Sequence, residues 1–279
     1  MDSLMPGEMA KQAEETGIKK VKRSFSKTFV LAILAGAFIS FGAIFATTVT
    51  AEITLSSSFT KLIGGLAFSL GLILVIVGGA ELFTGNNLIV MAWANKRIKT
   101  SQVLRNWSIV FFGNFVGAIS IVVLMFYSQQ YTSGTGGIGA KALRIAETKC
   151  SLGFVEAIIL GIFCNTLVCL AVWLCFSAKN TSGKILAIIF PITAFVVAGF
   201  EHSIANMYFI PKALLIKSFA PEKFWASINS SPEMYENLTW SNFIINNMFP
   251  VTIGNIIGGA VLVGFVYWFV YLNDNKKEE

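Results

Sequence analysis

Charged side chains are scarce in this 279-residue sequence. They make up 13% of the residues, about half of the share in an ordinary soluble domain, while apolar types account for 55%. A chain of this composition has too little polar surface to cover its apolar faces in water, which excludes a soluble enzyme or a soluble nucleic-acid-binding protein. The composition therefore indicates a protein whose solvent is the lipid bilayer.

Residues for metal or covalent chemistry are also few. His202 is the one histidine, so an HExxH metal site cannot form, and no GxSxG nucleophile turn is present. The cysteines lack CxxC spacing and are expected to be packing residues: Cys150, Cys164, Cys169 and Cys175. We therefore expect no enzyme activity, no cofactor and no metal. The net charge of +6 comes from basic residues beside apolar segments, which favours lipid headgroups over nucleic acid as the partner.

Long apolar stretches predict the architecture. Each of six stretches exceeds the roughly 20 residues that a helix needs to cross a bilayer. They are Thr28–Thr50, Leu62–Ala94, Asn106–Tyr127, Gly153–Ala178, Ile185–Pro211 and Phe243–Leu272. The sequence therefore predicts an all-α integral membrane protein with six transmembrane helices, and the even number places both termini on one side.

Lysine and arginine set the expected orientation. Most of them lie before span one, after spans two and four, and in the last tail, so these segments and both termini are predicted to be cytoplasmic, in a cell inner or plasma membrane. The expected units are a cytoplasmic amphipathic helix (1–27), a six-span domain (28–272) made of two repeats (28–127 and 153–272), and a cytoplasmic tail (273–279).

Apolar residues recur at helical spacing before the first span. They are Met5, Met9, Ala13, Val21 and Phe25, with lysine and glutamate on the other faces. The pattern predicts an amphipathic helix that anchors at the cytoplasmic surface. A movable gate is the alternative, because an amphipathic pattern reports burial and not motion.

Spans two and five are each interrupted by a polar segment of similar sequence. The first reads GGAELFTGNN from Gly78, and the second reads GFEHSIAN from Gly199. A constant offset aligns Gly79 with Gly199, Glu81 with Glu201, and Asn86 with Asn206. Residues 32–38 also resemble 157–163, and Gly113-Asn114 resembles Gly254-Asn255. We predict a three-span unit used twice, and its odd number of spans makes the second copy inverted, so that the two broken helices meet near the midplane.

The two breaks indicate the kind of solute. The half-helices 85–94 and 203–211 are expected to point their N-termini inward, where the positive ends of their dipoles favour an anion. A cation channel is an alternative interpretation because of Glu81 and Glu201, since intramembrane carboxylates are functional candidates by default. Their symmetric placement favours instead a structural role, in which they accept hydrogen bonds from backbone N–H groups exposed at the breaks. Asn86 and Asn206 are expected to be structural as well.

Polar side chains at and near the breaks are candidate contacts for the solute. His202 can donate a hydrogen bond to an anion and can exchange a proton near neutral pH, although burial disfavours its charged form. Thr84 offers a hydroxyl to the solute, or caps the half-helix that follows it. Asn114 lies in a Gly-Asn-x-x-Gly pattern typical of amides that bridge packed helices. Lys149, by composition alone, is an ordinary solvated loop charge.

Four segments resemble the formate/nitrite transporter family: GAELFTGNN, CNTLVCLAVW, GFEHSIANMYFIP and PVTIGNIIGG. The resemblance covers nearly the whole chain. It implies an aquaporin-like protomer of six spans, assembled as a homopentamer in the cell membrane, with a pore in each protomer for small monovalent anions. It also implies pore roles for His202, Thr84, Lys149 and Asn255. Apolar constrictions that gate by excluding water are implied at Phe68, Leu72, Leu82 and Phe195.

The residues after Thr84 bear on the choice of anion. Formate channels of the family usually follow this threonine with Ser-Thr, whereas Gly85-Asn86-Asn87 follows it here and resembles the nitrite and hydrosulfide branches. We therefore expect a hydrosulfide channel through which formate and nitrite also pass. The alternatives are a formate or nitrite channel, a proton-coupled anion carrier, and an aquaporin-like pore for neutral solutes, which lacks support from a paired Asn-Pro-Ala signature.

Overall fold

The described part of the chain, residues 4–53 and 56–273 of a computed structural model, is helical and contains no strand. Six segments in it are long and apolar enough to span a membrane. They are α2 (Phe25–Thr50), α3 (Ser57–Gly78), α5 (Thr100–Tyr127), α7 (Phe154–Ser177), α8 (Thr181–Ala198) and Trp240–Tyr271. The six-span prediction is confirmed. Helices suit such spans because they satisfy their backbone hydrogen bonds within the segment, and lipid offers no partners for these groups.

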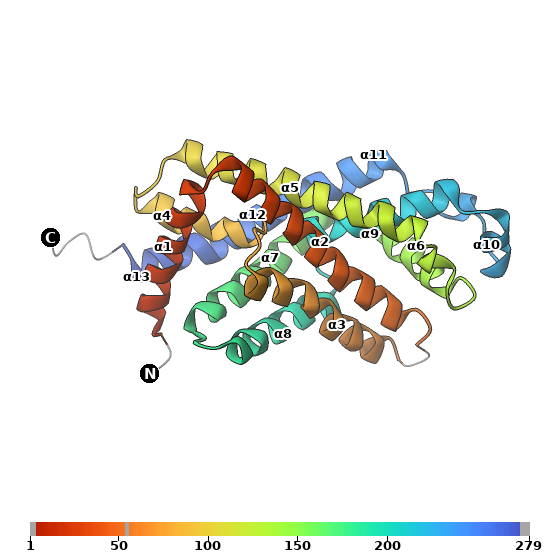
Figure 1. The fold of residues 1–279 in the computed structure, drawn as a ribbon, viewed down its shortest axis with the longest axis horizontal. Helices are drawn as coiled ribbons and strands as arrows, with labels where there is room; N and C mark the ends of the chain where they lie inside the picture. The colour runs from red at the N-terminus through yellow and green to blue at the C-terminus, as the bar shows by residue number, and fades with distance from the viewer. Residues whose placement is uncertain (1–3, 54–55, 274–279) are drawn as a thin grey trace.

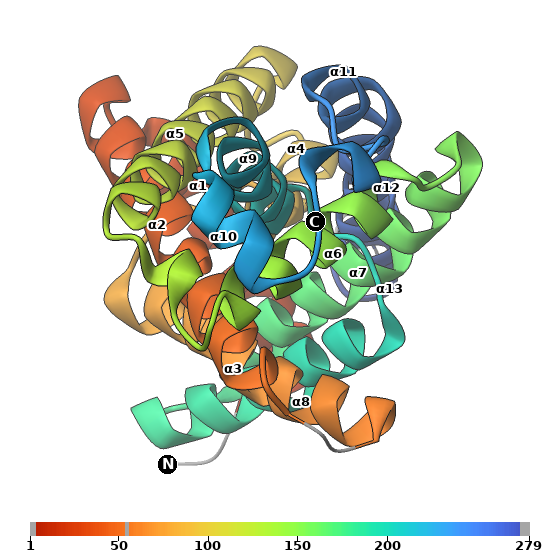
Figure 2. The same cartoon turned by 90° about the vertical axis from the view of Figure 1, so that its right-hand side faces the viewer.

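The last span is continuous but irregularly wound. It runs through α11 (Trp240–Asn242), the π-helical η4 (Phe243–Met248), α12 (Phe249–Ile256), the π-helical η5 (Ile257–Phe265) and α13 (Val266–Tyr271). In the first half of the chain α2 packs on α3 and α5; in the second half α7 packs on α8 and α12, and α3 meets α8 across the two halves. Figure 1 shows the resulting elongated bundle, with α1 (Pro6–Lys22) and α13 at the same end. Figure 2, viewed along the bundle, shows helices of both halves grouped around a common axis.

Close glycine contacts define the register between the two halves. A Cβ on Gly117 would clash with the Ile33 carbonyl oxygen, and a Cβ on Gly258 would clash with that of Ile162. Ile33 therefore corresponds to Ile162, whereas the match of residues 32–38 with 157–163 pairs it with Ile158. That predicted register is wrong by four residues, about one helical turn, because such a shift returns each apolar residue to the same helix face.

Each broken span turns at a glycine with a left-handed backbone. Gly79 (φ 82°) ends α3 and Gly199 (φ 74°) ends α8, a conformation that costs a residue with a Cβ. The N–H of the next residue bonds back to Val75 O in the first break and to Phe195 O in the second, at 2.9 and 3.0 Å. This closes each helix end without a partner from outside.

The second halves of the broken spans differ in length. The first consists of η1 (Gly85–Ile89) and α4 (Val90–Ala94), as expected. The second, α9 (Ser203–Phe219), extends past the predicted end at Pro211, which lies inside the helix. The predicted end is too early: a proline removes one backbone hydrogen bond, and α9 continues as part of a buried cluster that includes Ile210, Ala213 and Leu214.

The amino-terminal amphipathic helix is present as α1 (Pro6–Lys22), with Met9, Ala13 and Val21 buried. Two members of the predicted apolar stripe lie outside its buried face: Met5 is 66% exposed and Phe25 is 55% exposed. Met5 only precedes the helix, and Phe25 begins α2. The buried face packs on η1, α4, α7 and α13, so α1 covers the protein itself at the end of the bundle where α13 lies. Residues 274–279 of the predicted tail lie outside the described residues.

The opposite end of the bundle carries the two long connections. The first contains η2 (Gln130–Thr132) and α6 (Gly137–Cys150); the second contains α10 (Glu222–Ser227) and η3 (Pro232–Met234). A second apolar cluster holds them on α9, built around Tyr131, Leu143, Ile210 and Trp225. The α6 helix thus becomes a fixed wall of the cavity at this end.

Candidate functional site

Two cavities enter the bundle from opposite ends. The α1 vestibule, of about 290 Å³, has Lys20, Arg23 and Glu81 among its lining residues. The α6 vestibule, of about 380 Å³, has Lys149 and Glu201 in its wall. No residue of the described chain lines both cavities. Each vestibule therefore ends at the level of the helix breaks.

Large apolar side chains lie between the two vestibules. Leu72 and Leu82 line the α1 vestibule, and Phe68 and Phe195 line the α6 vestibule. All four are at most 4% exposed, and the rings of Phe68 and Phe195 meet edge to face with centroids 5.6 Å apart. These four residues, the apolar barrier, are those for which constrictions were expected, and the exclusion of water and ions by them stays a prediction.

His202 and Thr84 meet inside this barrier. The Nε2 atom of His202 lies 2.9 Å from Oγ1 of Thr84, and both residues are at most 3% exposed. The Nδ1 atom accepts the backbone N–H of Ala205 at 3.1 Å, so the bonding pattern assigns the ring proton to Nε2, which donates to Thr84. The hydroxyl hydrogen of Thr84 is then available for another acceptor.

Helix capping is assigned to the histidine and not to the threonine. Thr84 precedes η1, but its side chain makes no cap hydrogen bond there. His202 precedes α9 and its side chain caps that helix. The N-cap alternative for Thr84 is therefore wrong, because its hydroxyl faces the opposite break instead of the helix that follows it.

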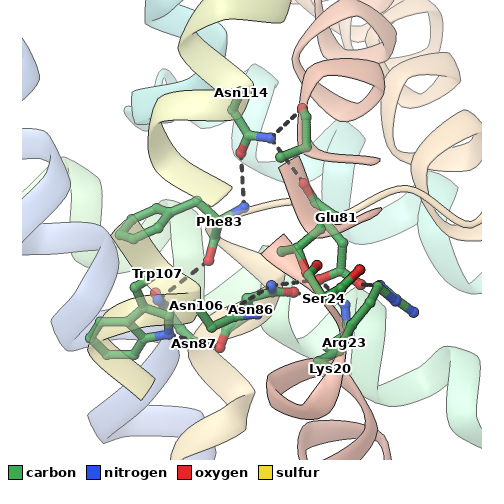
Figure 3. A network of polar contacts seen from close by, with 12 residues as sticks. Lys20, Arg23, Ser24, Glu81, Phe83, Asn86, Asn87, Asn106, Trp107 and Asn114 are labelled. Carbon is green, nitrogen blue, oxygen red and sulfur yellow. Dashed lines mark hydrogen bonds and ion pairs between the residues drawn. The ribbon is translucent and has the colours of Figure 1, made fainter. Parts of the chain in front are cut away.

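Glu81 lies at the centre of a buried polar network (Figure 3). Its carboxylate accepts hydrogen bonds from Lys20 at 3.0 Å, from Arg23, and from Asn86 at 2.7 Å. Asn86 also donates to Asn106 at 2.9 Å, and its own oxygen accepts from Lys20 at 2.8 Å. Two cations thus compensate one carboxylate that is 2% exposed.

Glu201 has the same kind of environment at the second break. It accepts from Lys149 at 2.7 Å, from Asn206 at 2.7 Å and from Asn247 at 3.1 Å. Asn206 in turn donates to Asn247 at 2.7 Å. The expectation that backbone N–H groups would bind the two carboxylates is wrong, because ammonium, guanidinium and amide donors from other helices occupy them. Buried carboxylates need such cationic partners, since desolvation of an uncompensated charge is costly.

The paired asparagines Asn114 and Asn255 hold the broken backbone. Asn114 accepts the N–H of Phe83 at 2.9 Å and donates to the carbonyls of Ala32 and Glu81 at 2.8 and 2.9 Å. Asn255 accepts the N–H of Ser203 at 2.9 Å and donates to the carbonyls of Gly161 and Glu201 at 2.8 and 2.9 Å. The Asn255 amide is thus used by the backbone, and its role in the pore stays a prediction.

Sequence reasoning missed two residues that position Thr84. Asn165 donates to the Thr84 carbonyl at 3.3 Å and to the Asn255 carbonyl at 2.6 Å, and the thiol of Cys169 also contacts the Thr84 carbonyl at 3.3 Å. Both lie on α7. The available signal was an amide in the middle of a 24-residue membrane span, since such a group requires a buried partner.

Comparison with known proteins shows which protein family has this arrangement. The family model for the formate/nitrite transporter matches residues 7–269. The chain belongs to the formate/nitrite transporter family. It is 48% identical over 275 residues to a formate channel FocA of Escherichia coli (strain K12), covering 98% of this chain and 96% of that protein. It is 41% identical to the formate channel FocA of Haemophilus influenzae, covering 94% and 93%.

Solved structures of the formate/nitrite transporter family share the fold. A pentameric formate channel with formate bound has a TM-score of 0.83 at 44% identity, and the match covers 89% of this chain and 98% of that one. An FNT family ion channel has a TM-score of 0.80 at 25% identity, over 94% and 98% of the two chains. This protein is therefore a multi-pass membrane channel of an anion-transporting family and not an enzyme.

Proposed function

We propose that this protein conducts small monovalent anions with formate as its principal substrate. The observation that carries the proposal is the pair of Thr84 and His202, two hydrogen-bond donors that face each other where the apolar barrier separates two wide vestibules. Relatives at 41–48% identity named as formate channels support the choice of formate.

The pair offers an anion a replacement for lost water. An anion between the two side chains takes the place of Thr84 Oγ1 as acceptor for the His202 Nε2–H, and it also accepts the freed Thr84 hydroxyl hydrogen. Desolvating an unpaired charge in an apolar constriction costs several kcal/mol, and two hydrogen-bond donors offset part of that cost. The barrier between the vestibules then limits passage to solutes small enough to use both donors.

We propose that His202 acts as a neutral hydrogen-bond donor. A second proton on Nδ1 would point at the backbone N–H of Ala205 and abolish the cap on α9. Loss of the Nε2 proton would create an imidazolate, which burial disfavours. The geometry thus favours hydrogen bonding over proton exchange, and an anion that crosses in protonated form takes its proton from water.

Hydrosulfide was expected from the Gly85-Asn86-Asn87 sequence. These asparagines bind Glu81, Asn106 and Asn165 and stabilise the break behind Thr84, so their identity does not select the anion. The named relatives favour formate. Hydrosulfide and nitrite remain secondary permeants to be compared in the same assay.

We further propose a homopentamer in the cell membrane with both termini in the cytoplasm. Support for the assembly is the likeness to a pentameric formate channel and the large apolar residues on the outer surface, such as Phe112 at 63% and Phe190 at 73% exposure. Support for the orientation is the concentration of lysine and arginine on the α1 side. Crosslinking in mild detergent tests the number of subunits.

Flux into liposomes tests the proposed function. Formate, hydrosulfide, nitrite, chloride, water and glycerol are compared at several pH values for the wild type and for His202→Phe. We expect rapid formate flux, slower hydrosulfide flux, no glycerol flux, and a loss of anion discrimination in the variant. Rapid water or glycerol flux without anion flux would establish the neutral-solute pore instead, and uphill accumulation driven by a pH gradient would establish a carrier.

A further inference from the structure

Lys212 is a buried cation without a compensating charge. It lies on α9 and is 3% exposed, yet its Nζ atom has no hydrogen-bond partner and no ion pair within the described residues. The Nζ atom lies over the ring of Tyr131, 5.9 Å from its centroid, an arrangement that attracts a charged ammonium group. No hydrogen bond or ion pair among the described residues depends on this ammonium group.

The position of Lys212 connects it to the α6 vestibule. The side chain borders a cavity of about 10 Å³ whose wall includes Gln130, Tyr208, Thr47 and Phe209. Thr47 and Phe209 also line the α6 vestibule, so the ammonium lies behind a wall shared by both cavities. The small cavity has room for about one water and is too small for formate. Lys212 therefore acts on a vestibule anion through the wall and not by contact.

The charges that line the α6 vestibule make this position important. Lys149 is ion-paired with Glu201 at 2.7 Å, so the pair contributes little net charge. Lys61 and Lys141 also line the vestibule, but Lys61 is exposed and Lys141 partly exposed, so salt screens the charge of both. A cation behind a low-dielectric wall is screened less by salt than an exposed one, so its field reaches the vestibule.

We propose that Lys212 attracts anions into the α6 vestibule. The proposal rests on the proposed anion conduction. An unpaired buried charge destabilises a fold. No structural role explains why the protein keeps Lys212 at this cost in stability, so we assign the lysine a functional role. Lys212 thus raises the local anion concentration before the Thr84 and His202 pair, while that pair and the apolar barrier set the maximal rate.

The test compares Lys212→Met, Lys212→Arg and Lys223→Met. Formate flux is measured against formate concentration in liposomes, and thermal unfolding is measured in mild detergent. Lys212→Met should raise the half-saturating formate concentration about fivefold with little change in maximal flux, and it should raise the unfolding temperature because an apolar side chain replaces an unpaired charge. Lys212→Arg keeps the charge and should retain the wild-type half-saturating concentration. Lys223 is exposed on α10, and its replacement should change neither quantity.

Each outcome has a distinct meaning. An unchanged half-saturating concentration in Lys212→Met, with wild-type formate flux present, overturns the role of Lys212 and leaves the proposed function intact. A lower unfolding temperature of Lys212→Met, or failure to assemble of both Lys212→Met and a further variant, Lys212→Gln, shows a structural lysine and also overturns it. Absence of anion flux in the wild type itself refutes the proposed function.

Discussion

Replacing Lys149 with methionine should destabilise the protein more than the same change at Lys20. Lys149 is the one cation bonded to Glu201 in the described chain, whereas Glu81 keeps Arg23 when Lys20 is removed. Removing one partner of a buried ion pair costs about 3–5 kcal/mol. Glu201 retains two amide donors, and the Lys149 side chain is 15% exposed, so the expected loss is about 2–3 kcal/mol. For Lys20→Met we expect about 1 kcal/mol.

Thermal or denaturant unfolding in mild detergent measures both variants. The double variant Lys149→Met with Glu201→Gln should recover most of the lost stability, because the glutamine is neutral and can still bond to Asn206 and Asn247. Equal losses for Lys149→Met and Lys20→Met would refute the reasoning that the number of compensating cations decides the cost. So would a double variant that is as unstable as Lys149→Met alone.

Three further predictions concern single residues. Thr84→Val should lower formate flux about tenfold, the equivalent of one lost hydrogen bond, while Thr84→Ser retains it; liposome flux measures both. Gly199→Ala should lower the free energy of unfolding by about 1–2 kcal/mol through the positive φ alone, since a Cβ there meets nothing within 4 Å. Gly85→Ala, whose Cβ makes an ordinary contact, should leave stability in thermal unfolding nearly unchanged. Burial is the main cause that raises the pKa of the Cys150 thiol to about 12. At pH 8 this thiol should therefore resist maleimide in the folded protein and react after unfolding. Rapid labelling of Cys150 in the native protein would contradict its burial.

Much of the fold was predictable because single residue types carry it. Length and apolarity specify the six spans, and the glycines at 79 and 199 mark the breaks because the chain needs a positive φ there. The register of the repeat was not predictable to within a helical turn, since residues four apart share a helix face. The end of α9 was missed because its tertiary contacts outweigh the local effect of Pro211.

The site was predictable in its members more than in its contacts. His202, Thr84, Glu81 and Glu201 are conspicuous because polar groups are rare in apolar spans. Their partners come from distant segments, such as Lys20, and no local pattern connects these segments to the breaks. Lys212 escaped notice because it lies one residue past the predicted end of span five, where a lysine is ordinarily solvated.

The pairing of Lys20 with Glu81 and of Lys149 with Glu201 shows that the internal repeat is larger than its three spans. Lys20 and Ile33 are separated by the same interval as Lys149 and Ile162, so α1 and α6 occupy equivalent places before spans one and four. The predicted repeat boundaries at 28 and 153 therefore exclude one helix of each unit. Each of these helices supplies the cation that makes its buried carboxylate tolerable. Any motion that withdraws α1 from its vestibule must break the bonds of both Lys20 and Arg23 to Glu81, so a gating movement of α1 requires another cation or a proton at that carboxylate.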